Sequence, residues 1–307
     1  LVERAKVASA ASGLAPGFLA SDWKNFFLDQ RPLTWRRTAQ LHRHGFELHE
    51  ELGKELNITS YSGMPAWKVG KASQNVCSNV SLGISSGMPL DLSGWEVHRR
   101  GTATAYVNPG ELCNKLVAAS VSNGAEFVQG CVNAVAQSVD DQAKNSRVEG
   151  VLVDDEVIPC NQLLLAMGSK TNLAERWLPA CRIPWALSTS ASTVFTVPLA
   201  SPSEGNAFFG FTDENGGNMD IFQCRGGSIH CVSQNPQMET KHVPLPQHLR
   251  DSSAEDSCAD GSAARLVANA SKLLGLDSKT PVRAQMLQRS CGADGLPVLG
   301  ALPHCSN

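Results

Sequence analysis

The sequence has few aromatic residues, a small net charge and no long apolar run. Phe, Trp and Tyr make up 6% of its 307 residues, which gives little support for stacking on nucleic-acid bases. No stretch of about 18 apolar residues occurs, so no membrane-spanning helix is expected. The formal charge of −3 does not favour nucleic acid or an anionic membrane surface as a partner. Neither nucleic acid nor a membrane is therefore an expected partner.

Cysteine is not scarce, but the arrangements that give it a metal or redox role are absent. The sequence has ten cysteines, yet none forms a Cys-x-x-Cys pair and no Cys/His cluster has zinc spacing. A disulfide framework is not expected in a chain this long, so we expect reduced, mostly buried thiols in a cytoplasmic protein. His42, His44 and His49 share one predicted helix without a carboxylate or third ligand at metal spacing, which favours a solvated helix face.

A glycine-rich turn is also missing ahead of the first predicted strand. Leu1 to Glu3 resembles the end of a buried strand with a carboxylate at its tip, and a small-residue loop over 8–13 follows. In a dinucleotide-binding unit such a carboxylate accepts hydrogen bonds from the ribose, about 20 residues after a Gly-x-Gly-x-x-Gly turn. Glu3 is therefore either this carboxylate, with the turn lying outside the sequence, or the end of an ordinary strand.

The first half of the sequence mixes helices and strands. Apolar residues at helical spacing predict helices over 34–56 and 109–122, the second with proline in its first turn. A strand is predicted over 126–139, and a hairpin over 147–159. The continuous apolar run 163–166 predicts a central parallel strand buried on both faces. It ends at Gly168, where the backbone is expected to approach another group closely.

The second half has short apolar segments joined by glycine- and asparagine-rich links. This pattern predicts a mostly antiparallel sheet and a second domain. An amphipathic helix is predicted over 263–274, followed by a strand over 281–289 that returns to the first domain. The strands of the sheet are predicted at 188–197, 207–211, 218–224 and 228–233.

Several motifs occur in an order and spacing that resemble one family. Val2-Glu3 is followed by Ala11-Ser12-Gly13 and Gly17-Phe18-Leu19, and the later motifs continue over nearly the whole chain. The sequence resembles the D-amino-acid-oxidase-like family of FAD-dependent oxidoreductases, and most closely its cytosolic putative oxidoreductases of eukaryotes. The later motifs are Val107-Asn108-Pro109-Gly110-Glu111-Leu112, the strand Val148 to Val153, Leu163 to Gly168, and Asp294-Gly295-Leu296-Pro297-Val298-Leu299-Gly300.

This resemblance implies an α/β fold with two domains. An incomplete Rossmann-like parallel sheet would bind FAD, and a mainly antiparallel α+β domain would bind the substrate. The FAD-binding domain would be discontinuous and comprise residues 1–60, 106–180 and 284–307. The substrate domain would comprise residues 61–105 and 181–283.

The implied FAD site lies where ligands bind open α/β sheets, at the carboxyl ends of parallel strands. Ser12 would donate to a phosphate oxygen, and Gly13 would let the backbone approach. Arg4 would offset phosphate charge, unless it is a surface arginine. Val132 occupies the position where family members hold the adenine through backbone groups, although a core valine is nearly as well supported. The full implied cofactor-binding set is Glu3, Arg4, Ser12, Gly13, Gly17, Phe18, Val132, Ala166, Gly168, Asp294, Gly295 and Leu296.

The implied activity is oxidation of a C–N bond in an amine or amino acid, with electrons passed to oxygen. Because a flavin carries its own chemistry, no catalytic triad is needed and the catalytic residues stay unassigned. Family enzymes hold the substrate carboxylate with an arginine, for which Arg225, Arg283 and Arg289 are candidates. Arg289 matches the family position, but Ser290 and Gly292 depart from the usual pattern after it. Structural salt bridges are the alternative for all three.

A non-catalytic, flavoprotein-like binding or regulatory protein is the second hypothesis. The missing glycine-rich turn and the departures near Asp294 favour it, whereas Glu3 and the loops on the flavin side favour an enzyme. The family also continues past the equivalent of Asn307 into a glycine-containing loop and a final helix. The 307 residues alone are therefore expected to hold FAD weakly and to express poorly.

Overall fold

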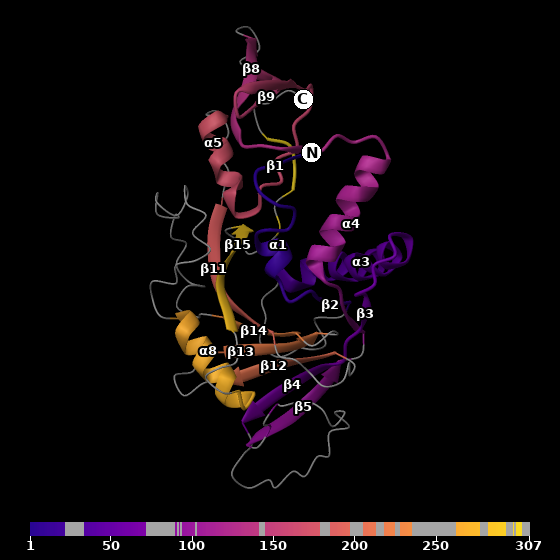
Figure 1. The fold of residues 1–307 in the computed structure, drawn as a ribbon, viewed down its shortest axis with the longest axis vertical. Helices are drawn as coiled ribbons and strands as arrows, with labels where there is room; N and C mark the ends of the chain where they lie inside the picture. Colours follow the sequence, from indigo (N-terminus) through magenta and orange to yellow (C-terminus); the bar gives the residue numbers. More distant parts are fainter. Residues whose placement is uncertain are drawn as a thin grey trace.

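The largest unit of the fold is a seven-stranded sheet of order β15-β11-β14-β13-β12-β4-β5 (Figure 1). The computed structural model describes residues 1–21, 34–71, 90, 92, 94–101, 103–140, 145–178, 185–196, 205–212, 218–224, 228–234, 262–276, 282–292, 297 and 299–302. In sheet order, the strands are β15 (Val282–Gly292), β11 (Trp185–Thr196), β14 (Ser228–Gln234), β13 (Asn218–Cys224), β12 (Asn206–Thr212), β4 (Ala66–Lys71) and β5 (Trp95–Gly101).

Neighbouring strands of this sheet are antiparallel with one exception. β12 and β4 run parallel, with Ala207 opposite Ala66. The pair β11 and β15 is the longest, and its register runs without a shift from Trp185 opposite Gly292 to Phe195 opposite Val282. Figure 1 shows these two strands extending from the sheet toward α5 (Ala174–Trp177). They therefore connect the sheet with the rest of the described fold.

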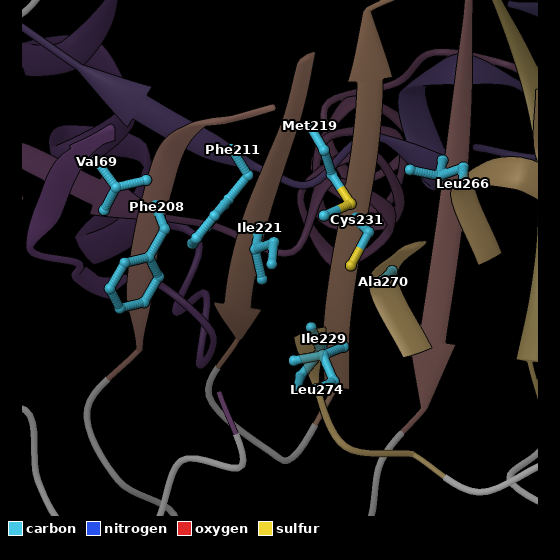
Figure 2. Close-up of a cluster of buried hydrophobic side chains, with 10 residues drawn as sticks. All are labelled: Val69, Phe208, Phe211, Met219, Ile221, Ile229, Cys231, Leu266, Ala270 and Leu274. Carbon is cyan, nitrogen blue, oxygen red and sulfur yellow. The ribbon is translucent and has the colours of Figure 1, made fainter. Parts of the chain in front are cut away.

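One face of the sheet is covered by the helix α8 (Ser262–Leu273). Leu266, Ala270 and Leu274 from this helix and the residue after its end pack on side chains of β12, β13 and β14, as Figure 2 shows. Full burial of each large apolar side chain contributes about 1.5–3 kcal/mol to stability. The sheet members of this cluster are Val69, Phe208, Phe211, Met219, Ile221, Ile229 and Cys231.

Three smaller sheets complete the fold. β1 (Val2–Glu3) pairs in parallel with β7 (Val128–Gln129). A meander is formed by β8 (Val132–Asp140), β9 (Asn145–Val153) and β10 (Glu156–Pro159). The third sheet has the order β2-β6-β3, from strands β2 (Phe18–Ala20), β6 (Thr104–Tyr106) and β3 (Ser62–Gly63).

Two longer helices, α3 (Thr34–Glu55) and α4 (Pro109–Ser122), are connected through one carboxylate. The Asn108 side chain caps α4 by accepting a hydrogen bond from the Glu111 N–H at 3.1 Å, as is typical of an N-cap residue. The Glu111 carboxylate in turn accepts hydrogen bonds from the N–H groups of Thr59 and Ser60, at 2.7 and 3.0 Å. This contact fixes the segment after α3 against the start of α4.

The expected fold class is confirmed, because the structure combines a parallel strand pair with mainly antiparallel sheets. Strand 218–224 and the hairpin over 147–159 form as predicted. The division into two domains with a boundary at residues 283/284 remains a proposal. This boundary lies within β15, which contacts β11 in the large sheet and also contacts α1 (Ala11–Leu14) and η1 (Gly168–Leu173).

The prediction of a central parallel strand at 163–166 is wrong. In the described part of the chain this segment belongs to no sheet. Leu163 and Leu165 pack against the β8-β9 meander, whereas Leu164 is 83% exposed. The segment is thus buried on one side only. An apolar run becomes a central strand only where other strands pair with both of its edges, and no described strand pairs with this run.

Among the described residues, no helix is both long enough and apolar enough to cross a membrane.

Candidate functional site

Glu3 lies at the carboxyl end of the parallel pair β1-β7. Its register partner is Gln129, and its carbonyl accepts a hydrogen bond from the Gly130 N–H at 3.0 Å. The Glu3 carboxylate oxygen Oε1 accepts from the Ala5 N–H at 2.9 Å. This local bond orients the carboxylate at the strand end, which is where an α/β sheet presents a group to a dinucleotide ribose. Arg4, the next residue, is exposed.

The Ser12-Gly13 loop forms the short helix α1. A Cβ at Gly13 would lie 1.7 Å from the Ala8 carbonyl oxygen, so only glycine fits there without a change in the backbone. The Gly13 N–H donates to the Ala10 carbonyl at 2.9 Å, and the Ser12 side chain is exposed. The loop is thus closely folded on itself, with Ser12 exposed.

The segment Gly17-Phe18 is fixed between the β2-β6-β3 sheet and the large sheet. Gly17 has a φ of +71°, and its carbonyl accepts a hydrogen bond from the Val107 N–H at 3.0 Å. The Phe18 ring lies edge-on to Phe209, with centroids 5.1 Å apart, and 5.7 Å from the ring of Phe222. Such aromatic pairs add about 0.5–1.5 kcal/mol beyond their burial. Phe18 therefore packs on the sheet face opposite the one that α8 covers.

This second sheet face, which we call the Phe18 face, holds a buried phenol and thiol. Burial raises the pKa of Cys224 to about 11, although hydrogen bonds from Tyr106 and Ser228 act in the opposite direction. Burial, together with the neighbouring Cys224, raises the pKa of Tyr106 above its usual range. Both groups are therefore protonated near neutral pH and contribute no charge to the Phe18 face.

A histidine that the sequence did not single out also lies on the Phe18 face. His230 on β14 is opposite Phe222 on β13 and opposite Val194 on β11. Val194 is in turn opposite Arg283 on β15, so these residues form one cross-strand row. Burial lowers the pKa of His230 to about 4. Only strand register could have revealed this row, because His230 lies in an ordinary apolar strand pattern.

The other expected cofactor residues lie around the meander and η1. Val132 begins β8 opposite Val153, and its side chain packs in the cluster of the meander. Ala166 is exposed, and Gly168 begins η1 with a φ of +55°. No described protein atom lies within 4 Å of a Cβ built at Gly168, so the close approach expected there is not made by the protein. Its positive φ accounts for the glycine.

The expected residues thus fall into groups that the fold brings together. Glu3 and Val132 are near each other through the register of β1 and β7. The elements that carry Ser12, Gly13 and Gly168 both contact β15. Arg289 is opposite Ser188 near the end of β15, whereas Arg283 lies near its start, so the two arginines belong to different cross-strand rows. Asp294, Gly295, Leu296 and Arg225 lie outside the described residues.

No protein-family model matches the chain, but solved structures match its fold over almost its whole length. L-amino acid deaminase from Proteus myxofaciens, solved with anthranilate, has a TM-score of 0.65 and 12% identity, and the match covers 99% of this chain and 77% of that one. Glycine oxidase from Geobacillus kaustophilus has a TM-score of 0.64 and 15% identity, with 98% and 78% covered. Glycerol-3-phosphate dehydrogenase from Bacillus halodurans, solved with FAD, has a TM-score of 0.55 and 13% identity, with 94% and 51% covered.

The chain therefore has the fold of amino-acid oxidases and deaminases. At these identities the likeness is one of fold, and it agrees with the fold that the sequence motifs imply.

Proposed function

We propose that this protein is an FAD-dependent oxidoreductase that oxidises a C–N bond of an amine or amino acid. The observation that carries the proposal is the likeness of fold to an amino-acid deaminase and a glycine oxidase over 98% or more of the chain. The motifs of the D-amino-acid-oxidase-like family along the same segments support it independently. The more specific proposal, that the protein is one of the cytosolic eukaryotic members of that family, rests on those motifs alone.

The residues present fit the adenosine and phosphate parts of FAD. Glu3, oriented by the Ala5 N–H at the end of a parallel strand, would accept hydrogen bonds from the ribose. The exposed Ser12 and the closely folded Gly13 would contact phosphate oxygens, with Arg4 nearby in sequence. Val132 and the segment from Ala166 to Gly168 would border the adenine and ribose. Asp294, Gly295 and Leu296 would complete the set near the flavin ring.

When bound, FAD would supply the redox chemistry of amine oxidation, in which a hydride leaves the carbon next to the substrate nitrogen, a proton leaves that nitrogen, and an imine remains, with dioxygen as the final oxidant and peroxide as its product. The role of this chain is to bind and orient the substrate and to exclude water. The packing of Phe18 on the buried rings of Phe209 and Phe222 supports the exclusion of water from this part of the Phe18 face.

An arginine would hold the carboxylate of an amino-acid substrate. Arg283 is the candidate that the register favours, since it lies in the cross-strand row of His230 and Phe222. Arg289 and Arg225 remain candidates from the sequence motifs. We also propose a cytoplasmic location, which the free thiols of Cys113, Cys131, Cys160, Cys224 and Cys231 support.

The test is to purify the 307-residue protein with added FAD and record its visible absorbance spectrum after gel filtration. A panel of amines and of D- and L-amino acids is then added with and without oxygen. We expect anaerobic bleaching of the flavin by at least one substrate, and peroxide when oxygen is present. Retained FAD without bleaching by any compound would instead support a non-catalytic binding or regulatory protein. Loss of FAD during gel filtration would agree with the weak binding expected of these residues, whereas no change in flavin fluorescence on titration with FAD would contradict the assigned cofactor.

A further inference from the structure

The corner between β7 and β8 lies beside Glu3 at the carboxyl end of the parallel strands. β7 ends at Gln129, which is opposite Glu3, and β8 begins at Val132. Between these strands, the Gly130 N–H donates a hydrogen bond to the Glu3 carbonyl at 3.0 Å. Ligands of open α/β sheets bind outside the carboxyl ends of such strands. The backbone from residue 130 to residue 132 therefore lies next to the residue that is proposed to bind the ribose.

One residue of a turn that is distant in sequence holds this corner by three hydrogen bonds. Asp154, between β9 and β10, accepts the Cys131 N–H with its carboxylate oxygen Oδ1 at 3.2 Å. The Asp154 N–H donates to the Cys131 carbonyl at 2.8 Å, and the Asp154 carbonyl accepts from Asn133 Nδ2 at 3.1 Å. Both backbone groups of Cys131 are thus bonded to Asp154, so the turn fixes the course of the corner.

Gly130 also packs directly on this turn. It is buried, and a Cβ built at Gly130 would lie 2.5 Å from Val153 Cγ1 and 2.8 Å from Asp154 Oδ2. A side chain at this position would therefore displace the Asp154 carboxylate or the corner itself. Glu3, Gly130 and Asp154 are in successive contact, which links the end of β1 to the turn.

The backbone of Asp154 has a conformation that few residues favour. Its φ is +51°, which glycine adopts freely and which asparagine and aspartate tolerate. Glycine would therefore serve at this position if only the turn mattered. The aspartate adds a charge-assisted hydrogen bond to the Cys131 N–H, which glycine could not make.

We propose that Asp154 is a positioning residue for the adenosine end of FAD. Asp154 is exposed on its turn and acts through the corner, whose place beside Glu3 it sets, rather than by contact with the cofactor. This inference rests on the proposed function and adds the residue that sets the shape of the ribose site. Loss of the Asp154 carboxylate should therefore weaken binding of the adenosine part and leave binding of the flavin part unchanged.

The test compares FAD with its parts. FMN lacks the adenosine, and ADP carries the adenosine without the flavin. Dissociation constants are measured by flavin fluorescence, and by calorimetry for ADP, with the wild-type protein and with Asp154→Gly, Asp154→Asn and Gly130→Ala. Asp154→Gly removes the carboxylate but adopts the positive φ freely, whereas Asp154→Asn retains an acceptor oxygen. Asp155→Ala is the matched control, because it removes an exposed carboxylate from the same turn. Melting temperatures without flavin report on the fold of each variant.

We expect Asp154→Gly to weaken the binding of FAD and of ADP by the same factor, about tenfold for one hydrogen bond to a charged group, and to leave FMN binding unchanged. Gly130→Ala should show the same selective loss. Asp154→Asn should restore part of the affinity, and Asp155→Ala should bind FAD as the wild-type protein does. Equal losses for FAD and FMN would overturn the proposal, as would unchanged FAD and ADP binding in Asp154→Gly. A residue with only a structural role would lower the melting temperature and weaken FAD and FMN binding together.

The outcomes separate this inference from the proposed function. A selective loss of FAD and ADP affinity in Asp154→Gly, without peroxide formation from any amine, would support the positioning role and contradict the oxidase activity. Peroxide formation with unchanged FAD binding in Asp154→Gly would do the reverse. Absence of FAD and ADP binding to the wild-type protein would contradict both.

Discussion

The Glu111 carboxylate accepts both the N–H and the hydroxyl of Thr59, at 2.7 and 2.9 Å. The same carboxylate also accepts the Ser60 N–H, and the Ser60 hydroxyl accepts the Asn108 N–H at 2.9 Å. One side chain of α4 thus satisfies backbone groups of the segment that follows α3. This contact holds the start of α4 against the segment that follows α3.

Replacing Glu111 with Gln should lower the free energy of unfolding by about 1 kcal/mol. The amide has one acceptor oxygen instead of two and no charge, so bonds to Thr59 and Ser60 are weakened or lost. Urea denaturation with the cofactor state held constant measures the effect. Glu47→Gln, at an exposed position of α3, is the control and should change stability by less. Equal effects of the two variants would contradict the role of Glu111.

The same carboxylate gives a pH dependence of stability. Burial alone would raise the pKa of Glu111, but the hydrogen bonds from Ser60 and Thr59 outweigh it and lower the pKa below 4.5. A carboxyl with a depressed folded-state pKa stabilises the fold above its unfolded pKa, and this contribution is lost as the pH falls through the folded pKa. Wild-type stability should therefore fall more steeply below about pH 4.5 than that of Glu111→Gln. Parallel curves would show that Glu111 does not contribute.

Replacing Gly17 with Ala should destabilise the protein by more than about 2 kcal/mol. The added Cβ would lie 1.9 Å from the Val107 carbonyl oxygen at a φ of +71°, so both a clash and backbone strain arise. Gly124→Ala is the matched control, since Gly124 also has a positive φ, +91°, but open space around its Cβ position. Thermal unfolding should show a clearly larger loss for Gly17→Ala. Similar losses would mean that the backbone at Val107 shifts at little cost to accommodate the added methyl group.

Replacing Glu3 with Gln should weaken FAD binding about tenfold or more, because a charge-assisted hydrogen bond to the ribose is weakened. The dissociation constant can be measured by the change in flavin fluorescence as the apoprotein is titrated. Glu126→Gln is an appropriate control, because Glu126 is exposed and lies just before β7, the partner strand of β1. An unchanged dissociation constant in Glu3→Gln would show that the ribose is not bound by Glu3.

The described cysteines should differ widely in their reaction with iodoacetamide. Cys224 and Cys231 are buried, and burial raises the pKa of both thiols, that of Cys224 to about 11. Cys113, Cys131 and Cys160 are only partly buried. Because the thiolate is the reactive form, the partly buried cysteines should be labelled first in the folded protein, as peptide mass spectrometry would show. Early labelling of Cys231 would indicate that the α8 core opens readily.

Local signals in the sequence predict much of the fold. Asn108, Pro109 and Gly124 mark the ends of α4, and the structure places that helix between them. Alternating apolar residues and glycine-rich links likewise predict β13 and the β9-β10 hairpin. Such features succeed because capping, turns and side-chain periodicity are determined within a few residues.

Features that depend on partners far along the chain were not predictable. The run from Leu163 to Ala166 has the composition of a central strand, but no described strand pairs with it. The position of His230 in a cross-strand row could not be predicted either, because the row depends on the register of β14 with β11 and β13 and of β11 with β15. Glu3, Ser12 and Gly13 were found by motif, whereas their exact contacts with a cofactor remain predictions.

The parallel contact between β4 and β12 has a consequence for how the chain reaches its fold. Ala66 and Ala207 are neighbours in the sheet although residues 67–206, nearly half of the chain, lie between them. Contacts between such distant segments carry a large loop-closure cost and slow folding. During synthesis the antiparallel pair β4-β5 emerges long before β12, so one edge of β4 has no partner until β12 is made. Unpaired edges of this kind are sites of aggregation, and the yield of folded protein should therefore increase with slower synthesis or added chaperones.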